Sequence, residues 1–494
     1  MTDIEAIRAD LEQFSGEMDR EVYENFSGQK DDMDTEGIYA RHSQVFENED
    51  LIYEIGERRA AAQGTDRLRM SYLYAYLVTG YIGRRTTALD DRINSTQSRS
   101  EIEVDGRKMP FQYSAVALAN EPDRARREAI DSARNVVVGQ LNPLYCERLE
   151  ASHGFAGQFG YDGYVAMCQD LSGVDLSALR TQVQNILYRT DRLYTRHFKN
   201  MCKDILGLSL SDVRRHDVAY LFRVKEFDRF FAADRMMKVL DDTLAGMGLD
   251  GAKNIKVDAE PRERKRPRAF CCGIRVPDEI VLCIMPKGGM DDYRALFHEM
   301  GHAQHFGNVA REQAFEFKYL GDNAVTESFA FLFEHLIGNR NWLNQHFELK
   351  DEDLFSLAQF TAFQTLFMVR RYAAKLIYEL ELHSGAEAPE KIYAQLLGDA
   401  LKFRHNEDHY LFDTDTGFYS ASYLRAWMFE VQLRNVLSEK FGTTWWNERQ
   451  AGEYLRGLWS TGQKFDAARM ARNLGYYGID EYPLVKYLEK SLRY

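Results

Sequence analysis

The stretch MDDYRALFHEMGHAQHF, residues 290–306, places three histidines and a glutamate within eight positions of a 494-residue chain that has only 12 histidines. Two glycines precede the stretch, and Asp291 has the side chain of a helix start. Apolar residues recur at steps of three and four, which predicts an amphipathic helix with one buried face. The predicted buried stripe consists of Tyr293, Leu296, Phe297, Met300 and Ala303.

The histidines lie on the other face of this predicted helix. His298 and His302 are four positions apart, so their imidazoles project side by side and can reach one ion. Glu299 is rotated by about 100° from His298, which puts its carboxylate beside the ion, where a general base would act on a metal-bound water. The five-residue pattern alone also fits a polar helix face that is merely rich in histidine.

A catalytic zinc site needs a third protein ligand and an open position for water. One known spacing, H-E-x-x-H-x-x-G-x-x-H, requires glycine at position 305 and histidine at position 308. This sequence has His305 and Asn308, so that arrangement is excluded. The remaining arrangement takes a glutamate from a second helix.

The segment GDNAVTESFAFLFEHLIGNR, residues 321–340, predicts such a helix, with Asp322 or Asn323 as its cap. Glu327 and Glu334 are seven positions apart on one face and are flanked by phenylalanines, where a carboxylate is costly unless it is paired or bound to a metal. We expect Glu327 to be the ligand and Glu334 to accept a proton from a ligand imidazole. The other interpretation is that both glutamates lie on a solvated helix edge.

Composition and charge limit the classes of partner. The formal charge of −13 disfavours nucleic acid and anionic membranes, and no apolar run approaches the roughly 18 to 20 residues that span a bilayer. The start, MTDIEAIRADLEQF, predicts an acidic amphipathic helix and lacks a secretory pattern, so a cytoplasmic location is expected. The six scattered cysteines are expected to be reduced and mostly buried.

Helical periodicity dominates the chain, and only nine prolines interrupt it. Asp105-Gly106 between short alternating segments predicts a hairpin turn, and residues 271–289 predict a second hairpin. The basic run in residues 262–268 is interpreted as a solvated loop and not as a nucleic-acid patch. We expect a mainly α protein with a small sheet beside the histidine helix, divided into a helical lobe, 1–250, and a catalytic lobe, 251–494.

His298-Glu299-x-x-His302, followed 25 positions later by Glu327, resembles the thimet oligopeptidase and oligoendopeptidase F group of zinc metallopeptidases. HEMGHAQH also matches the H-E-x-G-H-x-x-H form of that group, in which the last histidine, here His305, is not a ligand. The resemblance implies a large two-lobed helical peptidase with a deep central cleft. It also implies one Zn²⁺ per chain, held by His298, His302 and Glu327, with Glu299 as the base.

The segment DTGFYSASYLRAWMFEVQL, residues 415–433, resembles the tyrosine-bearing segment of the same group. By that likeness Tyr419 and Tyr423 would donate hydrogen bonds to the substrate carbonyl and the tetrahedral intermediate. The group usually has a histidine about five residues before the first tyrosine, where this chain has Thr414, and His409 lies earlier. From the residues alone, a tyrosine pair four apart is more often part of a core.

The likeness in sequence spans about residues 260–440 and implies hydrolysis of peptide bonds in short oligopeptides. The run GIRVPDEIVLCI, residues 273–284, could offer an edge to which an extended peptide adds as a strand. Three alternatives stay open: a metallocarboxypeptidase with the same zinc motif, a non-catalytic peptide-binding protein that contains zinc, and an enzyme acting on a non-peptide amide. The sequence does not determine the physiological substrate or the oligomeric state.

Overall fold

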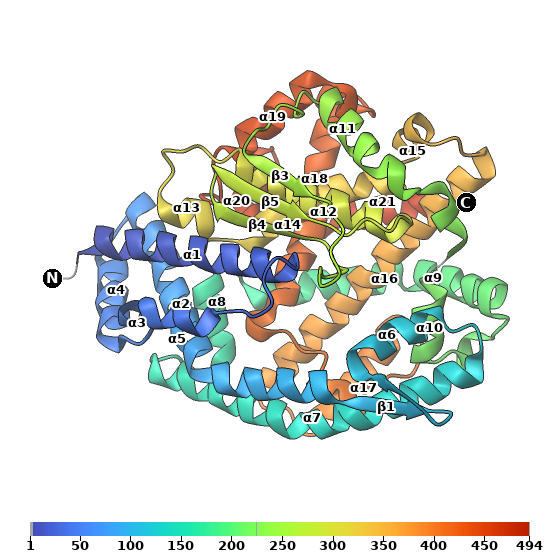
Figure 1. Ribbon diagram of the computed structural model, residues 1–494, viewed down its shortest axis with the longest axis horizontal. Helices are drawn as coiled ribbons and strands as arrows, with labels where there is room; N and C mark the ends of the chain where they lie inside the picture. The colour runs from blue at the N-terminus through green and yellow to red at the C-terminus, as the bar shows by residue number, and fades with distance from the viewer. Residues whose placement is uncertain (1–2, 224, 494) are drawn as a thin grey trace. The chain divides into compact units, whose positions relative to one another are not determined.

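A computed structural model describes residues 3–223 and 225–493 and shows a mainly helical protein, as the sequence predicts (Figure 1). The described residues form 21 α-helices and five short β-strands. The chain forms two compact units, each assembled from separate stretches of sequence. Unit 1 comprises Met1–Tyr81, Lys225–Thr361 and Arg425–Leu484, and unit 2 comprises Ile82–Val224, Ala362–Leu424 and Val485–Tyr494.

Unit 1 contains the predicted histidine helix and the small sheet. Its helices are α1 (Ile4–Phe26), α2 (Thr35–Arg41), α3 (Ser43–Phe46), α4 (Glu49–Ala61), α11 (Met236–Gly246), α12 (Met290–Gly307), α13 (Phe315–Tyr319), α14 (Asn323–Glu334), α15 (Arg340–His346), α19 (Arg449–Trp459) and α20 (Ala467–Asn473). Its strands are β3 (Ile255–Asp258), β4 (Phe270–Arg275) and β5 (Glu279–Cys283).

Unit 2 consists of helices and one hairpin. Its helices are α6 (Phe111–Asn120), α7 (Arg124–Gln158), α8 (Tyr164–Ser172), α9 (Leu176–Met201), α10 (Arg215–Leu221) and α17 (Pro389–Leu401). The hairpin pairs β1 (Glu101–Val104) with β2 (Arg107–Pro110) through Asp105 and Gly106, both at positive φ, so the predicted turn is confirmed.

Four helices contribute residues to both units. They are α5 (Gly64–Arg99), α16 (Asp351–His383), α18 (Tyr419–Phe441) and α21 (Glu481–Ser491). The expected division into 1–250 and 251–494 does not coincide with the compact units. Long helices continue through the unit boundaries, so the units do not follow the change in composition near residue 250.

The three-stranded sheet of unit 1 has the order β3-β5-β4, with β3 parallel and β4 antiparallel to β5. The predicted hairpin of residues 271–289 is therefore confirmed. β5 is paired on both sides, so within the run 273–284 only the β4 part offers a strand edge. Helix α1 packs alongside β4, and α12 packs on β4 and β5 (Figure 1).

Helix α12 begins and buries its apolar face largely as the sequence predicts. Its N-cap is Gly289, and Asp292 accepts hydrogen bonds from the N–H groups of Lys287 and Gly288 at 2.6 and 2.9 Å. Asp292, and not the expected Asp291, therefore fixes the turn before the helix. Every residue of the predicted apolar stripe is buried: Tyr293, Leu296, Phe297, Met300 and Ala303.

Helix α14 is fixed at its start by Asp322, which caps the helix by accepting from Ala324 N–H at 3.0 Å. The same carboxylate makes two 2.7 Å bonds with the buried guanidinium of Arg425. Burial alone would raise the pKa of Asp322, but Arg425 holds it below its ordinary value. This bidentate pair gives α14 a fixed position in unit 1 because removal of either partner would leave a buried charge.

Helices α12 and α14 pack unusually closely at Gly301. A Cβ added at this glycine would lie 2.4 Å from the carbonyl oxygen of Phe329 and 2.5 Å from the Cα of Ala330. Real Cβ atoms do not approach backbone atoms so closely, so only glycine fits here without movement. A glycine within a predicted helix indicates that another backbone packs closely there, and the structure confirms this at Gly301.

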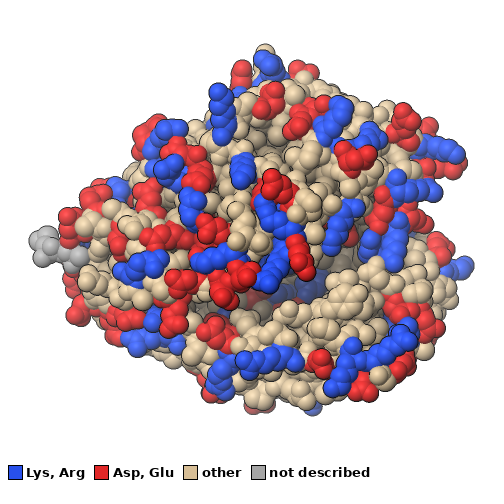
Figure 2. All heavy atoms as spheres, in the orientation of Figure 1, with Lys and Arg blue, Asp and Glu red and all other residues tan. Residues whose placement is uncertain are grey.

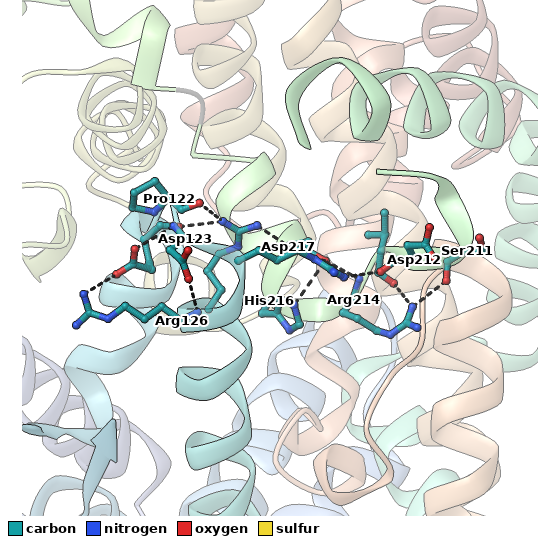
Figure 3. Close-up of polar contacts among 12 residues, drawn as sticks. Pro122, Asp123, Arg126, Ser211, Asp212, Arg214, His216 and Asp217 are labelled. Atoms are coloured by element: carbon teal, nitrogen blue, oxygen red, sulfur yellow. Dashed lines mark hydrogen bonds and ion pairs between the residues drawn. The ribbon is translucent and has the colours of Figure 1, made fainter. Parts of the chain in front are cut away.

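Unit 2 has a buried ion network between the start of α7 and α10 (Figure 3). Asp217 is fully buried and accepts from Arg127 at 2.9 Å, from Arg124 at 3.2 Å and from the N–H of Arg214 at 3.0 Å. Burial raises the pKa of Asp217, but the two arginines bring it below its ordinary value. The network therefore joins two helices that lie about 90 positions apart in sequence.

Charged side chains of both signs are intermixed over the face of the molecule in Figure 2. Within the basic run 262–268, the interpretation as a solvated loop is wrong for Lys265. This lysine is buried, and its ammonium lies 3.0 Å from Asp258 Oδ1. All six cysteines are free thiols, as expected. No helix in the described part of the chain is both long and apolar enough to cross a membrane.

The close approach at Gly301 predicts that Gly301→Ala lowers the free energy of unfolding by about 2–3 kcal/mol, because the two helix backbones must separate. Chemical denaturation followed by circular dichroism would measure this change. Gly83→Ala is the matched control, because Gly83 lies in α5 and its added Cβ would meet no atom within 4 Å. The free energy of unfolding of this control should rise by about 0.5–1 kcal/mol. A similar rise for Gly301→Ala would contradict the packing argument.

Candidate metal centre

The structure brings three of the predicted site residues together on α12 and α14. His298 Nε2 lies 3.5 Å and His302 Nε2 lies 3.8 Å from Glu327 Oε2. One ligand atom of each residue lies within 4.8 Å of the others. Glu327 is buried, while the two histidine side chains are 19% and 14% exposed, so part of the group is accessible to solvent.

The other ring nitrogen of each histidine has a partner on α14. His298 Nδ1 lies 2.9 Å from Glu334 Oε2, and His302 Nδ1 lies 2.7 Å from Thr326 Oγ1. A carboxylate accepts a proton, so the Nδ1–H of His298 donates to Glu334. Both Nε2 atoms lie on the Glu327 side. Loss of the second ring proton of His298 would leave its Nε2 lone pair facing Glu327, which is the arrangement that metal-binding histidines adopt.

Electrostatics separate the roles of the two histidines in the metal-free protein. Burial lowers the pKa of His298, but Glu327 and Glu334 raise it to about 10. Burial lowers the pKa of His302 to about 3, so this imidazole stays neutral. A cation that binds here must therefore displace a proton from His298, and its affinity would rise with pH.

Arg294 completes the chain of contacts behind His298. Its guanidinium pairs with Glu334 Oε1, while the other oxygen of that carboxylate accepts from His298. Burial raises the pKa of Glu334, but Arg294 and His298 bring it down to about 2. Glu334 therefore stays ionised, so it holds the His298 ring in one orientation.

Glu299 lies beside this group without belonging to it. The N–H of Cys271 on β4 donates to its carboxylate, and burial raises the pKa of Glu299 to about 7. A carboxylate with a pKa near neutrality accepts a proton from water and returns it more readily than an ordinary glutamate does. Its position one residue after His298 is the one expected for a base.

The donor set fits a zinc ion. Tetrahedral zinc with bonds of roughly 2.0–2.2 Å separates its ligand atoms by about 3.3–3.6 Å. The measured separations of 3.5 and 3.8 Å from Glu327 come close to that range. Two neutral imidazole nitrogens with one carboxylate are also the ligands of a catalytic zinc site that keeps a position open.

The remaining predicted residues lie outside this group. His305 is fully buried, and its Nε2 lies 3.4 Å from the carbonyl oxygen of Gly462, so it contacts neighbouring structure as expected. Tyr419 and Tyr423 belong to unit 2, where they occupy the first turn of α18 with their ring centroids 5.1 Å apart. The Tyr423 ring also contacts Tyr372 at 5.2 Å.

His409, which precedes the tyrosine segment, is part of the packed interior of unit 2. It is buried in unit 2, with Nε2 2.8 Å from the side-chain oxygen of Asn135. The turn before Tyr419 is instead held by the buried Glu379, which accepts from the N–H of Asp415 at 2.6 Å and from Ser420 Oγ at 2.8 Å.

Two residues that orient the metal group, Thr326 and Arg294, were not predicted from the sequence to do so. Thr326 directly precedes Glu327, and a hydroxyl next to a candidate ligand is a usable signal. Arg294 lies one helical turn before His298, on the polar stripe of the same helix. Its pairing with Glu334 depends on how α12 and α14 cross, which spacing within one helix does not specify.

Comparison with solved structures identifies a protein with the same architecture. It is the crystal structure described as "a putative oligoendopeptidase F" from Bacillus anthracis str. Ames. The match covers 96% of this chain and 84% of that chain, with a TM-score of 0.63 and 13% sequence identity. The two chains share one fold. The likeness includes the N-terminal half, where the sequence alone indicated only helices.

Sequence-based comparisons give no further relative. The chain matches no protein-family model and no curated protein. The fold is therefore known from structure, and the chemistry has to be argued from the residues of the site.

The raised pKa of Glu299 predicts a pH-dependent effect of Glu299→Gln on the metal-free protein. A carboxyl whose pKa rises from 4.5 to about 7 on folding stabilises the protein fully below pH 4.5, and this contribution is lost as the pH rises through 7. The variant should therefore exceed the parent by about 3 kcal/mol in free energy of unfolding at pH 8, with a smaller difference at acidic pH. Denaturation of chelator-treated protein between pH 4 and 8 would measure this.

Glu312→Gln is the control for this experiment, because Glu312 is exposed. It should change the unfolding free energy little at any pH. A Glu299→Gln curve parallel to that of the parent would contradict the burial of an ionisable carboxyl at this position.

Proposed function

We propose that this protein is a zinc-dependent metallopeptidase that hydrolyses peptide bonds in short oligopeptides. One observation supports this most directly: the two Nε2 atoms lie 3.5 and 3.8 Å from Glu327 Oε2, the three ligand atoms lie within 4.8 Å of one another, and Glu299 lies beside them. A purely structural zinc would close its fourth position with another ligand and would have no use for a base. The shared fold with an oligoendopeptidase-like chain agrees with the proposal.

His298, His302 and Glu327 would hold the ion, which supplies Lewis acidity to a carbonyl and to water when it is bound. Glu299 accepts a proton from the attacking water and then passes it to the leaving amine. In the metal-free protein, burial raises the pKa of Glu299, which favours acceptance of a proton by this carboxylate. Glu334 and Thr326 keep the ligand rings in place during the reaction.

Tyr419 and Tyr423 are proposed to donate hydrogen bonds to the oxyanion. This assignment rests on the resemblance of residues 415–433 to the tyrosine segment of the oligopeptidase group. The two phenols lie one turn apart at the start of α18, so both can face the same substrate group. Internal cleavage is preferred here over carboxy-terminal trimming, because the fold is that of a chain described as an oligoendopeptidase.

The central test pairs Glu299→Gln with Glu327→Ala. Glu299→Gln should keep about one zinc per chain by elemental analysis and lose kcat by about 100-fold or more, because only the base is removed. Glu327→Ala should lower the zinc affinity at least about 100-fold, because a ligand is removed. Cleavage of a mixed peptide library, followed by mass spectrometry, would give the activity and the position of the cleaved bonds.

Glu312→Ala is the control for both variants, because Glu312 is exposed and is neither a predicted zinc ligand nor the predicted base. Near-parent turnover by Glu299→Gln would rule out the general-base role. Full zinc occupancy in Glu327→Ala after dialysis would remove Glu327 from the ligand set.

Tyr423→Phe tests the oxyanion assignment. Loss of one donor to the developing charge should lower kcat by about 100-fold and leave KM nearly unchanged, because the contact strengthens only in the transition state. Tyr372→Phe is a matched control, since Tyr372 contacts the Tyr423 ring without an assigned role. Equal kcat values for Tyr423→Phe and the parent would end this assignment.

A further inference from the structure

A second carboxylate lies along the same strand edge as Glu299. The N–H of Cys271 on β4 donates to Glu299, and the N–H of Gly273 donates to Asp19 of α1. Since β5 pairs along the opposite edge of β4, both carboxylates lie along its free edge. Two residues of a regular strand span about 7 Å, which sets the scale of the separation between the two N–H donors. The pairing of β4 with β5 is irregular between Cys272 and Arg275, so Gly273 lies in this irregular part of the strand.

Gly273 leaves the space between these groups without a side chain. A Cβ at this position would lie 2.9 Å from Val276 Cγ2, 3.8 Å from Phe306 Cδ2 and 3.9 Å from Asp19 Oδ2. The Asp19 carboxylate and the Phe306 ring therefore border the place where any other residue would carry its side chain. The Phe306 ring is nearly parallel to that of His302, with ring centroids 6.1 Å apart, so this place adjoins the metal group.

Asp19 differs from most acidic residues of its helix in having no basic partner. Five other carboxylates of α1 lie near a base. The pairs are Glu5 with Arg8, Asp10 with His42, Glu12 with Lys318, Glu17 with Arg41, and Glu21 with Lys30. Among the described residues, no lysine, arginine or histidine forms an ion pair with Asp19. This carboxylate therefore faces β4 with one hydrogen bond, from Gly273, as its polar contact.

This environment penalises the charged form of Asp19. The side chain is half-buried, and burial raises the pKa of its carboxyl to about 6, although the Gly273 N–H works in the opposite direction. One N–H occupies only part of the acceptor capacity of a carboxylate, which can take about four hydrogen bonds. A cation beside it would restore the stabilisation that burial removes.

We propose that Asp19 binds a cationic group of the peptide substrate within about two residues of the cleaved bond. The group is an ammonium or guanidinium, carried by a basic side chain or by a free amino terminus. The assignment rests on the proposed peptidase function. A peptide that lies beside β4 passes first Glu299, next to Cys271, and then Asp19, next to Gly273. The positions of these two residues on β4 therefore set the distance between the cleaved bond and the bound cation.

Asp19→Asn is the informative variant, because the amide oxygen can still accept from Gly273 N–H while the charge is lost. The probes are alanine-rich quenched-fluorescence peptides with one lysine, or norleucine in its place, at each position within three residues of the cleaved bond. Each peptide is made with a free and with an acetylated amino terminus. The exchange of lysine for norleucine tests recognition of a basic side chain, and acetylation tests recognition of the free amino terminus.

The parent should prefer the cationic peptide over its neutral match by about 10-fold in kcat/KM at one position. Asp19→Asn should reduce that ratio to about one, while cleavage of the neutral peptide changes little. Glu12→Gln, the matched change on the same helix, should keep the parent's ratio. The same preference in Asp19→Asn and the parent, or no preference in the parent, overturns the assignment.

Binding separates this inference from the proposed function. Peptide affinities are measured by isothermal titration calorimetry in the zinc-loaded Glu299→Gln protein, with and without Asp19→Asn. Loss of Asp19 should raise the Kd of the cationic peptide about 10-fold and leave that of the neutral peptide unchanged. Equal Kd values, or no binding of either peptide, overturn the role of Asp19. Absence of cleavage by the parent would instead count against the peptidase function.

Discussion

The backbone contact between Gly301 of α12 and residues Phe329 and Ala330 of α14 is the constraint on which the metal group depends. With no Cβ in the way, the two helices approach until side chains on facing turns can meet. Glu327 precedes this contact on α14 by less than one turn, and His298 and His302 flank it on α12. A wider separation of the helices would move Glu327 Oε2 away from the two imidazoles, which it now approaches to 3.5 and 3.8 Å.

Close packing alone would not give chemically useful ligands. His298 has a raised pKa in the metal-free protein because two carboxylates face it, while His302 is kept neutral by burial. Arg294 compensates the charge of Glu334, so the buried carboxylate that orients His298 does not have to be protonated. Glu299 has no such arginine and therefore keeps a pKa near 7. The two helices thus supply two acids whose pKa values shift in opposite directions, which suits Glu334 to orientation and Glu299 to proton transfer.

Features with a local physical cause could be predicted from the sequence. The buried stripe of α12, the cap Asp322, the Asp105-Gly106 turn and the approach at Gly301 all follow from periodicity or residue type. The histidine pair was found because two ligands four apart need only one helix, and Glu327 and Glu334 because carboxylates inside an aromatic helix need a partner; the predicted contact of Glu334 with a ligand imidazole is present. Other pairings between distant segments, such as Asp322 with Arg425, were not predicted, because many partners satisfy the same chemistry. The two compact units were also not predictable, since long helices carry no sign of where packing partners change.

The strand edge beside α12 relates the base to the rest of the peptide path. In a sheet of three strands, β4 has one free edge, and the N–H donors described on it already bind carboxylates from α12 and α1. The two acids differ in what surrounds them: Glu299 has a histidine and further carboxylates nearby, whereas Asp19 has an aromatic ring and the bare backbone of Gly273. A carboxylate among charged groups can exchange protons, while a half-buried carboxylate without an ion-pair partner is stabilised by binding a cation. The carboxylates along β4 can therefore act on the bond to be cleaved and also select a positive charge on the substrate about two residues from that bond.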